Sequence, residues 1–458
     1  MTKNKQIHLG VHFPGVNNTT VWADPASGSQ IDFKSFKYLA QRAEAAKFDF
    51  IFLAEGLRLR EHKGQIFDLD VVGRPDTLPI LAAIAAVTER LGLAGTINTT
   101  FNEPYELARQ FASLDLVSDG RAAWNLVTSP DAFTGENFRR GGFLPYDQRY
   151  ERAEATVAAT RTLWDSREDH AGASPATQDQ ELADAGVPFA INNAFFNISG
   201  SFTTPRAPQG HPVLFQAGDS DQGREFAART ADVVFSMHSE FAQAQAFYAD
   251  VKGRLDKYGR SRDELKILPA TAVVLGGTAE EARLKAEAIK LQQVSGPGAI
   301  AFLEQIWGQD LSAFDPEGPL PPYDPQATAD VTRGRVRHIK DPAAIVAKWQ
   351  ELATANDWSI RQLVIAVTGR QQLVGTPEQV ADEIERYVNH GATDGFILVP
   401  HLTPAGLDDF FDTVVPILQA RGSFRSEYAG STLRDHLGLN VPQTRTGASR
   451  NDLATAGV

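Results

Sequence analysis

Eight short apolar runs, spaced along most of the chain, constrain its fold more than any other feature. Each has the length of a buried β-strand, and segments with a helical spacing of apolar residues lie between them. Buried strands that alternate with helices favour a parallel sheet, and eight of them can close a barrel. We therefore predict a (β/α)8 TIM barrel with long insertions and a C-terminal extension. The predicted strands are Ile7–Phe13, Phe50–Ala54, Leu91–Ile97, Ala122–Val127, Val213–Ala217, Val233–Phe235, Ile267–Val274 and Phe396–Val399.

A weak internal repeat supports this fold. A helix end with alanine or glycine, then an aspartate, then an apolar run recurs at Asp49, Asp232 and Asp394. The alternative is that any protein of alternating strands and helices repeats in this way.

Two segments, at about 168–208 and 294–348, break the alternation. The first is polar and then rich in phenylalanine and asparagine, and the second contains the proline-dense PEGPLPPYDP. Loops this long within compact domains are usually lids or binding elements, and otherwise disordered. We predict a single barrel domain over residues 1–440 with both segments as insertions, the second being a candidate lid. A polar tail follows at 441–458, and the chain after Arg421 has the composition of a frayed end, with an arm packed on a neighbouring subunit as the alternative.

Composition excludes several classes of function. The chain has no cysteine, which excludes disulfides, thiolate nucleophiles and cysteine metal sites. Its net charge of -13 and its lack of a basic block disfavour nucleic acid and anionic membranes as partners. No apolar run approaches the length of a membrane-spanning helix or a signal peptide, so we expect a cytoplasmic location.

The first predicted strand turns two histidines toward the barrel interior. His8 and His12 alternate with apolar residues that face the helix layer. His12 lies nearer the mouth and is the candidate proton donor or acceptor, since imidazole with its ordinary pKa of about 6.5 suits proton transfer at neutral pH. A core histidine is the alternative. The two rings would stand ~13 Å apart, too far to share a metal ion, and we expect no metal site.

The turn after the fifth predicted strand has the composition of an anion-binding site. Gly218 permits a tight turn, Ser220 stands where a helix N-cap belongs, and Gly223 leaves room for an approaching phosphate. The unpaired N–H groups and the dipole of the following helix attract an anion. A plain N-cap is the alternative, and Asp219 and Asp221 oppose a phosphate unless their side chains point outward.

Residues 119–154, DGRAAWNLVTSPDAFTGENFRRGGFLPYDQRYERAE, comprise a predicted strand, a loop too irregular for helix or strand, and the start of a helix. With the turn at 216–223 and GTPEQVADEIERYVNHGATDGFILV at 375–399, this stretch resembles the nitrilotriacetate, pristinamycin-synthase and dibenzothiophene-sulfone monooxygenases of the bacterial luciferase-like superfamily. The resemblance covers about residues 5 to 440. It implies a two-component enzyme that takes FMNH2 from a separate NAD(P)H:flavin reductase and O2 as co-substrate. A C4a-peroxyflavin would transfer one oxygen atom to a small organic substrate, and the protein would be a homodimer or homotetramer.

The resemblance also implies which residues hold the FMN phosphate. Gly218 and Ser220 bind it with neighbouring backbone amides, and Tyr150 reaches it. Tyr146 stands where relatives often have histidine, and its phenol can still donate a hydrogen bond. Pro130 replaces a histidine that some relatives have, and proline has no side-chain group to donate.

Five further residues are implied to contact the flavin on other loops. Glu55 ends the second strand, where several relatives have aspartate. Asn98 and Thr99 are placed near the edge of the isoalloxazine ring. Ser129 matches a serine that contacts the flavin, and Thr128 lies beside it.

Aromatic residues at or just after the predicted strand ends are candidates for a dry substrate pocket. We select Phe13, Phe101 and Phe133, whereas Trp124, inside the fourth strand, fits the core better. Arg58 and Arg60 near Glu55 are candidates to receive an anionic substrate, with solvated charges or an ion pair as the alternative.

Three other functions compete with this reading. One is a deazaflavin-dependent oxidoreductase on the same fold, and another is a flavin-binding protein without turnover. The third is a metal-dependent barrel hydrolase, which the histidine spacings disfavour. The sequence contains no G-x-G-x-x-G that opens a helix after a strand and no G-x-S-x-G, so neither a nicotinamide domain nor a nucleophile elbow is predicted.

Overall fold

The computed structural model describes residues 5–14, 20–59, 61–66, 73–129, 132–139, 144–145, 148–167, 187–326, 332–333, 341–369 and 372–443. Its centre is a closed barrel of parallel strands in the order β1, β2, β5, β6, β9, β10, β11 and β14, with β14 paired to β1. The barrel strands are β1 (His8–His12), β2 (Phe50–Leu53), β5 (Gly92–Asn98), β6 (Ala122–Val127), β9 (Val213–Gln216), β10 (Val233–Ser236), β11 (Lys266–Leu275) and β14 (Gly395–Leu398). All eight predicted strands and the TIM barrel are confirmed.

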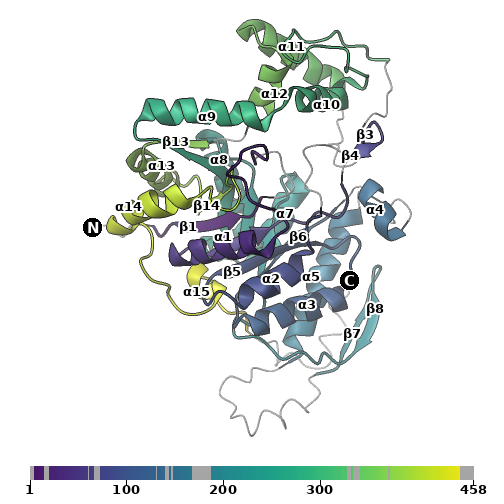
Figure 1. The fold of residues 1–458 in the computed structure, drawn as a ribbon. Coiled ribbons are helices and arrows are strands. Elements are labelled where there is room, and N and C mark those ends of the chain that lie inside the picture. The colour runs from purple at the N-terminus through teal and green to yellow at the C-terminus, as the bar shows by residue number, and fades with distance from the viewer. Residues whose placement is uncertain are drawn as a thin grey trace.

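Helices surround the barrel, and further helices and short strands extend from it (Figure 1). The helices are α1 (Phe33–Ala45), α2 (Thr77–Ala85), α3 (Pro104–Val117), α4 (Ala132–Arg139), α5 (Arg149–Asp165), α7 (Asp221–Thr230), α8 (Phe241–Arg254), α9 (Ala279–Gln293), α10 (Gly296–Trp307), α11 (Pro342–Asn356), α12 (Ile360–Thr368), α13 (Pro377–Asn389), α14 (Val415–Ala420) and α15 (Leu433–Leu437). The remaining strands are β3 (Glu61–His62), β4 (Gln65–Ile66), β7 (Phe189–Asn192), β8 (Asn197–Gly200), β12 (Thr332–Arg333) and β13 (Gln372–Gly375). Within the described residues, no helix is long and apolar enough to cross a membrane.

The alternation along β1 sorts side chains between two cores, as predicted. Leu9 and Val11 pack with residues of α1 and α13 in the outer core. Gly10 faces the interior, where a Cβ added to it would lie 2.3 Å from the Phe50 ring. Glycine is therefore needed here so that Phe50 can fill the barrel, where its ring meets Phe215 edge-on at 4.9 Å.

The repeated aspartates share one structural role at the amino end of the strands. Asp49, Asp232 and Asp394 each precede a strand and accept a backbone N–H from the neighbouring strand, at 2.7, 2.9 and 2.9 Å. Burial alone would raise the pKa of Asp49, but the Arg425 guanidinium 2.6 Å away, together with His8, holds that pKa at about 2. These carboxylates therefore join adjacent strands as ionised groups.

The segment predicted to be an insertion at 294–348 is helical over part of its length. Ser295 caps α10, and Trp307, Leu303 and Ile300 of that helix form a separate core with residues of α11 and α12. Figure 1 shows these three helices as a lobe, the α10–α12 lobe, set apart from the barrel. The other segment, 168–208, lies outside the described residues up to 186 and then forms the antiparallel β7–β8 hairpin.

Two predictions about irregular segments are wrong. The loop after β6 contains α4, which is held by Asn137 donating to the Leu57 carbonyl at 2.9 Å. The chain after Arg421 is not frayed over its described part, because α15 closes the amino end of the barrel. Leu433 and Leu437 of α15 join the interior core and are fully buried.

Candidate active site

The predicted site residues that the structure describes gather at the carboxyl ends of the barrel strands, where α/β barrels carry their sites. His12 ends β1, Glu55 follows β2, Asn98 ends β5, and Ser220 follows β9. Tyr150 reaches the same end from the first turn of α5.

Ser220 is the N-cap of α7, as predicted. Its side-chain oxygen accepts a hydrogen bond from the Gly223 backbone N–H at 3.1 Å, and its backbone is extended. That bond leaves the hydroxyl proton free to donate to a ligand. The first N–H groups of α7 have no carbonyl partner within the helix, so this exposed helix start can bind an anion.

Two glycines bring this turn, α7 and Tyr150 into close contact. A Cβ on Gly218 would lie 2.8 Å from the Tyr150 hydroxyl and 2.9 Å from the Gly223 Cα. A Cβ on Gly223 would lie 2.7 Å from the same hydroxyl. The Tyr150 ring is buried and meets Phe226 of α7 edge-on at 5.9 Å. The predicted phosphate contacts Gly218, Ser220 and Tyr150 are therefore brought together.

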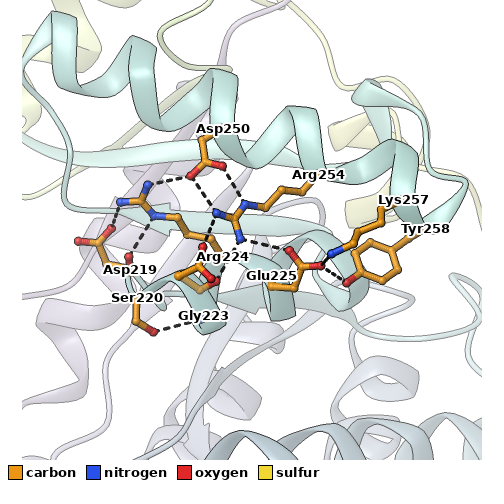
Figure 2. Close-up of polar contacts among 10 residues, drawn as sticks. Asp219, Ser220, Gly223, Arg224, Glu225, Asp250, Arg254, Lys257 and Tyr258 are labelled. Atoms are coloured by element: carbon orange, nitrogen blue, oxygen red, sulfur yellow. Dashed lines mark hydrogen bonds and ion pairs between the residues drawn. The ribbon is translucent and has the colours of Figure 1, made fainter.

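The aspartates on either side of Ser220 are paired with cations rather than with the helix start. Asp219 binds Arg224 at 3.0 Å and the His238 Nε2 at 2.7 Å. Asp221 binds Arg254 at 2.6 Å. Figure 2 shows the Asp219 carboxylate turned toward Arg224, on the other side of the turn from the Ser220 hydroxyl. Both carboxylates are therefore bound away from the helix start, as a phosphate site requires.

Glu55 and Asn98 form a pair between neighbouring strand ends. The Asn98 Nδ2 donates to the two Glu55 carboxylate oxygens at 3.3 and 3.1 Å, and its Oδ1 accepts from the Phe101 N–H at 2.8 Å. Asn98 is fully buried. Glutamate in place of aspartate at position 55 therefore holds the buried Asn98 side chain in one orientation.

The remaining residues predicted to contact the flavin differ in how deeply they are buried. Thr99 is fully buried, and its hydroxyl donates to the Val127 carbonyl at 3.4 Å, so this side chain is bonded within the protein. Thr128 and Ser129 are half-buried directly after β6. Tyr146 and Pro130 lie outside the described residues.

His12 is buried in the barrel interior near its mouth. It pairs in register with Phe52 of β2, and the two rings lie 5.5 Å apart. Phe52 in turn stacks on Phe235 of β10 at 5.3 Å. The imidazole therefore adjoins an aromatic layer that closes the barrel beneath the mouth.

The predicted substrate pocket needs one correction. Phe13 is fully buried and stacks on Phe36 of α1 at 3.9 Å, so it belongs to the outer core and does not face the mouth. Phe101 is half-buried and stacks on Phe138 of α4 at 4.8 Å. Phe133 lies in the first turn of α4, and its side chain lies outside the described residues. Trp124 packs on Phe111 of α3, as expected of a core residue.

Three groups near the mouth were missed in the sequence. Glu136 of α4 pairs with Arg58, so the ion-pair alternative for that arginine holds. Asn125 donates to Thr96 at 2.9 Å inside the barrel, while its buried Oδ1 has no partner among the described residues. His401 follows β14, and burial lowers its pKa to about 4. Only its position after a strand end could have identified His401.

No group of three histidine, aspartate or glutamate side chains within the described residues could hold a metal ion. His8, the second histidine of β1, instead contacts Asp49 at 3.2 Å at the opposite end of the barrel. The hydrolase alternative therefore gains no support from the described part of the chain.

Comparison with known proteins places this chain in a family. A model described as luciferase-like monooxygenase matches residues 12–394. Nitrilotriacetate monooxygenase component A of Aminobacter aminovorans is 40% identical, over 97% of this chain and 98% of its own. The crystal structure of DmoA from Hyphomicrobium sulfonivorans has a TM-score of 0.80 at 28% identity and covers 99% of this chain and 97% of its own. That of riboflavin lyase with modified FMN and riboflavin has a TM-score of 0.74 at 28% identity, covering 98% and 99%. The chain therefore belongs to the luciferase-like monooxygenase family and is a flavin-dependent monooxygenase.

Proposed function

We propose that this protein is the oxygenating component of a two-component monooxygenase that uses reduced FMN and O2 to insert one oxygen atom into a small organic substrate. The observation that carries the proposal is the anion seat, defined as the turn Gly218–Ser220 and the start of α7 with the Tyr150 hydroxyl beside it. A phosphate bound there would fix one end of FMN at the rim of the barrel.

The residues present fit this cofactor. Side chains at positions 218 and 223 would fill the space at the Tyr150 hydroxyl, and both residues are glycine. The flanking aspartates are neutralised by arginines, which removes their repulsion of an anion. The Asn125 Oδ1, buried in the interior without a partner among the described residues, is an acceptor that a polar ring edge would satisfy.

The bound reduced flavin supplies the reaction with O2, and the protein supplies binding, orientation and exclusion of water. Ser220, Tyr150 and the N–H groups of α7 would bind the phosphate. The Glu55–Asn98 pair presents a fixed polar edge at the mouth. His12 is the proposed proton donor or acceptor, and its burial beside Phe52 keeps bulk water from the ring. We assign the α10–α12 lobe the role of a lid.

A flavin reductase is the proposed partner, because the sequence has no nicotinamide-binding G-x-G-x-x-G after a strand. The name of the Aminobacter relative, component A, supports a divided system. Its 40% identity over nearly the whole chain favours this function over the deazaflavin-dependent alternative. Assembly as a homodimer or homotetramer is a further proposal, which light scattering on the purified chain would check.

The test is product analysis under 18O2. The protein is incubated with FMN, NADH, a flavin reductase and a panel of aminopolycarboxylates, sulfones and alkanes, and the products are analysed by mass spectrometry. We expect one 18O atom in the product of at least one substrate, and loss of this product when Ser220 and Tyr150 are both replaced. Saturable FMN binding without any labelled product would instead favour a flavin-binding protein without turnover.

A further inference from the structure

The anion seat lies between two carboxylates, and this creates a physical problem. Asp219 and Asp221 flank Ser220, and aspartate is itself a good capping group for the N–H groups of a helix start. Either carboxylate, if released, would repel a phosphate or compete with it for those N–H groups. A phosphate can therefore bind there only if both acids are held elsewhere.

Asp219 is held by hydrogen-bond donors from two different elements. Arg224, in the first turn of α7, and His238, two residues after β10, both donate to the same oxygen, Asp219 Oδ1, at 3.0 and 2.7 Å. The Asp219 side chain is 55% exposed, so these bonds rather than burial determine its direction. Burial raises the pKa of Asp219, but the hydrogen bonds from His238 and Arg224 outweigh it and lower the pKa.

His238 and Arg224 are positioned by the same aromatic ring. The His238 imidazole stacks on Phe247 of α8 at 4.8 Å, and the Arg224 guanidinium lies over that ring at 4.8 Å. The His238 backbone N–H donates to the Ser236 hydroxyl at 3.0 Å. Arg224 also donates to the Asp219 carbonyl at 3.0 Å, so it shapes the turn itself, whereas His238 contacts only the side chain of Asp219.

The second aspartate is held by a matching arginine. Arg254 of α8 binds the Asp221 carboxylate at 2.6 Å. Asp250 connects the two arginines that hold these aspartates, since its oxygens accept from Arg224 and from Arg254, each at 2.8 Å (Figure 2). The two acids beside Ser220 are thus tied to one network on α7 and α8.

We propose that His238, together with Arg224, is a positioning residue that holds the Asp219 carboxylate away from the anion seat and so keeps the start of α7 open for the flavin phosphate. This rests on the proposed function. His238 Nε2 donates to Asp219 whether the ring is neutral or protonated, so the role requires no proton transfer.

The test compares two ligands that differ only in the phosphate. Dissociation constants for FMN and riboflavin are measured by fluorescence titration of the full chain, in the wild type and in the His238→Ala, Asp219→Ala and double variants. For His238→Ala we expect FMN affinity to fall by about tenfold, because Asp219, then held by Arg224 alone, can turn its like charge toward the phosphate, while riboflavin affinity is unchanged. The double variant should regain wild-type FMN affinity, which a merely structural loss would not allow.

Further variants keep the test decisive if His238→Ala does not fold. His238→Gln retains a donor for Asp219 and should keep FMN affinity near the wild type. Asp219→Ala alone should bind FMN at least as tightly as the wild type, whereas a seat that needs this carboxylate would lose FMN. His390→Ala, exposed at the end of α13, is the matched control.

Two outcomes would overturn the proposal, and they are distinguishable. If His238→Ala weakens FMN and riboflavin equally, or if the double variant stays weak, the positioning role is wrong while the seat stands. If the wild type binds FMN no tighter than riboflavin, the seat itself is wrong, and the positioning role fails with it.

Discussion

At the scale of single residues, the site depends on two glycines more directly than on any charged group. Gly218 and Gly223 bring the turn after β9 and the start of α7 within van der Waals contact of the Tyr150 hydroxyl. A methyl group at either position would separate the three elements that form the anion seat.

The first prediction concerns Gly223→Ala. The new Cβ would meet the Tyr150 hydroxyl at 2.7 Å and the Gly218 backbone at 2.9 Å, and backbone cannot move as cheaply as a flexible side chain. We expect FMN affinity to fall about tenfold or more, since about 1.4 kcal/mol of lost contact suffices. Titration with FMN measures this.

Gly253→Ala is the matched control for that substitution. Gly253 lies inside α8, and nothing stands within 4 Å of a Cβ built on it. Alanine should therefore stabilise the protein by about 0.5–1 kcal/mol through helix propensity alone. Equal effects of the two substitutions on FMN binding would contradict the role of Gly223.

The second prediction concerns the Glu55–Asn98 pair. Asn98→Asp would set a fully buried carboxylate against Glu55. We expect a loss of about 2–4 kcal/mol in the free energy of unfolding, measured in urea, because a buried charge is left facing a like charge. The swapped variant Glu55→Gln/Asn98→Asp should recover most of that loss.

Asn193→Asp, in the exposed turn between β7 and β8, is the control for the buried substitution, because its Oδ1 accepts two backbone N–H groups and a carboxylate can do the same; it should stay within about 0.5 kcal/mol of the wild type. An Asn98→Asp protein as stable as the wild type would show that the two side chains do not depend on each other.

At the scale of elements, the strands could be predicted because barrel strands are buried on both faces and so read as continuous apolar runs. Several helices could not, among them α10 and α4. In α10, the Ser295-Gly-Pro-Gly start has the residues of a loop, yet Ser295 caps the helix and Pro297 suits its first turn. In α4, the contacts of Asn137 and Glu136 with the loop after β2 replace an apolar stripe, and such contacts leave no local pattern.

The candidate site likewise combines features that the sequence predicts with features that it does not. The cap at Ser220 and the permissive glycines are local in sequence and were predicted. The pairing of Asp219 with His238 crosses between two βα loops, and that of Arg58 with Glu136 joins a loop to a helix far along the chain. Only the closed barrel brings these partners together, so spacing in the sequence could not reveal them.

The α10–α12 lobe is fastened to the loop after β2, which also carries Glu55. Glu304 of α10 is fully buried and contacts His62 at 2.7 Å and Lys63 at 2.9 Å, both from the β3–β4 hairpin. Strand β12 pairs with β3 in the same region. Movement of the lobe would therefore be transmitted to the hairpin and toward the mouth.

The third prediction tests this fastening with Glu304→Gln. The amide keeps the shape but removes the charge that binds Lys63, so we expect hydrogen exchange of the β3–β4 amides to rise about tenfold, as for loss of roughly 1.4 kcal/mol. Mass-spectrometric exchange measures it. Glu317→Gln, an exposed glutamate of the same lobe paired with Arg361, should leave the exchange of the hairpin unchanged. Equal protection in both variants would contradict the coupling.

At the scale of the whole molecule, the two ends of the barrel carry charged groups with different roles. The mouth carries the candidate site, whereas the amino end holds buried groups that join strands. Asp394 there is bound by Lys5 and Lys252, and burial, which raises its pKa, is outweighed so that the pKa is about 2. Such carboxylates stabilise the fold at every pH above about 4 and lose that contribution only in stronger acid.

Buried histidines affect the stability of the fold in a higher pH range. Burial sets the direction of their pKa shifts, whereas opposite charges set that of Asp394. Burial lowers the pKa of His436 and of His401 to about 4 and also lowers the pKa values of His8 and His211. Between about pH 6.5 and 4 the unfolded chain therefore takes up protons that the folded chain does not, so stability falls as pH falls. Asp115 opposes this trend, because burial raises its pKa to about 7 and the folded chain holds that proton.

The last prediction assigns part of this acid sensitivity to the end of the barrel closed by α15. His436→Phe keeps a ring against Tyr428, 4.6 Å from it in the wild type, but removes the titrating group. The loss of unfolding free energy between pH 6.5 and 4.5, measured in urea, should shrink by about 2 kcal/mol. His390→Phe, exposed directly after α13, should leave the loss as in the wild type. If His436→Phe leaves it equally steep, the histidine beneath the barrel is not a source of its acid sensitivity.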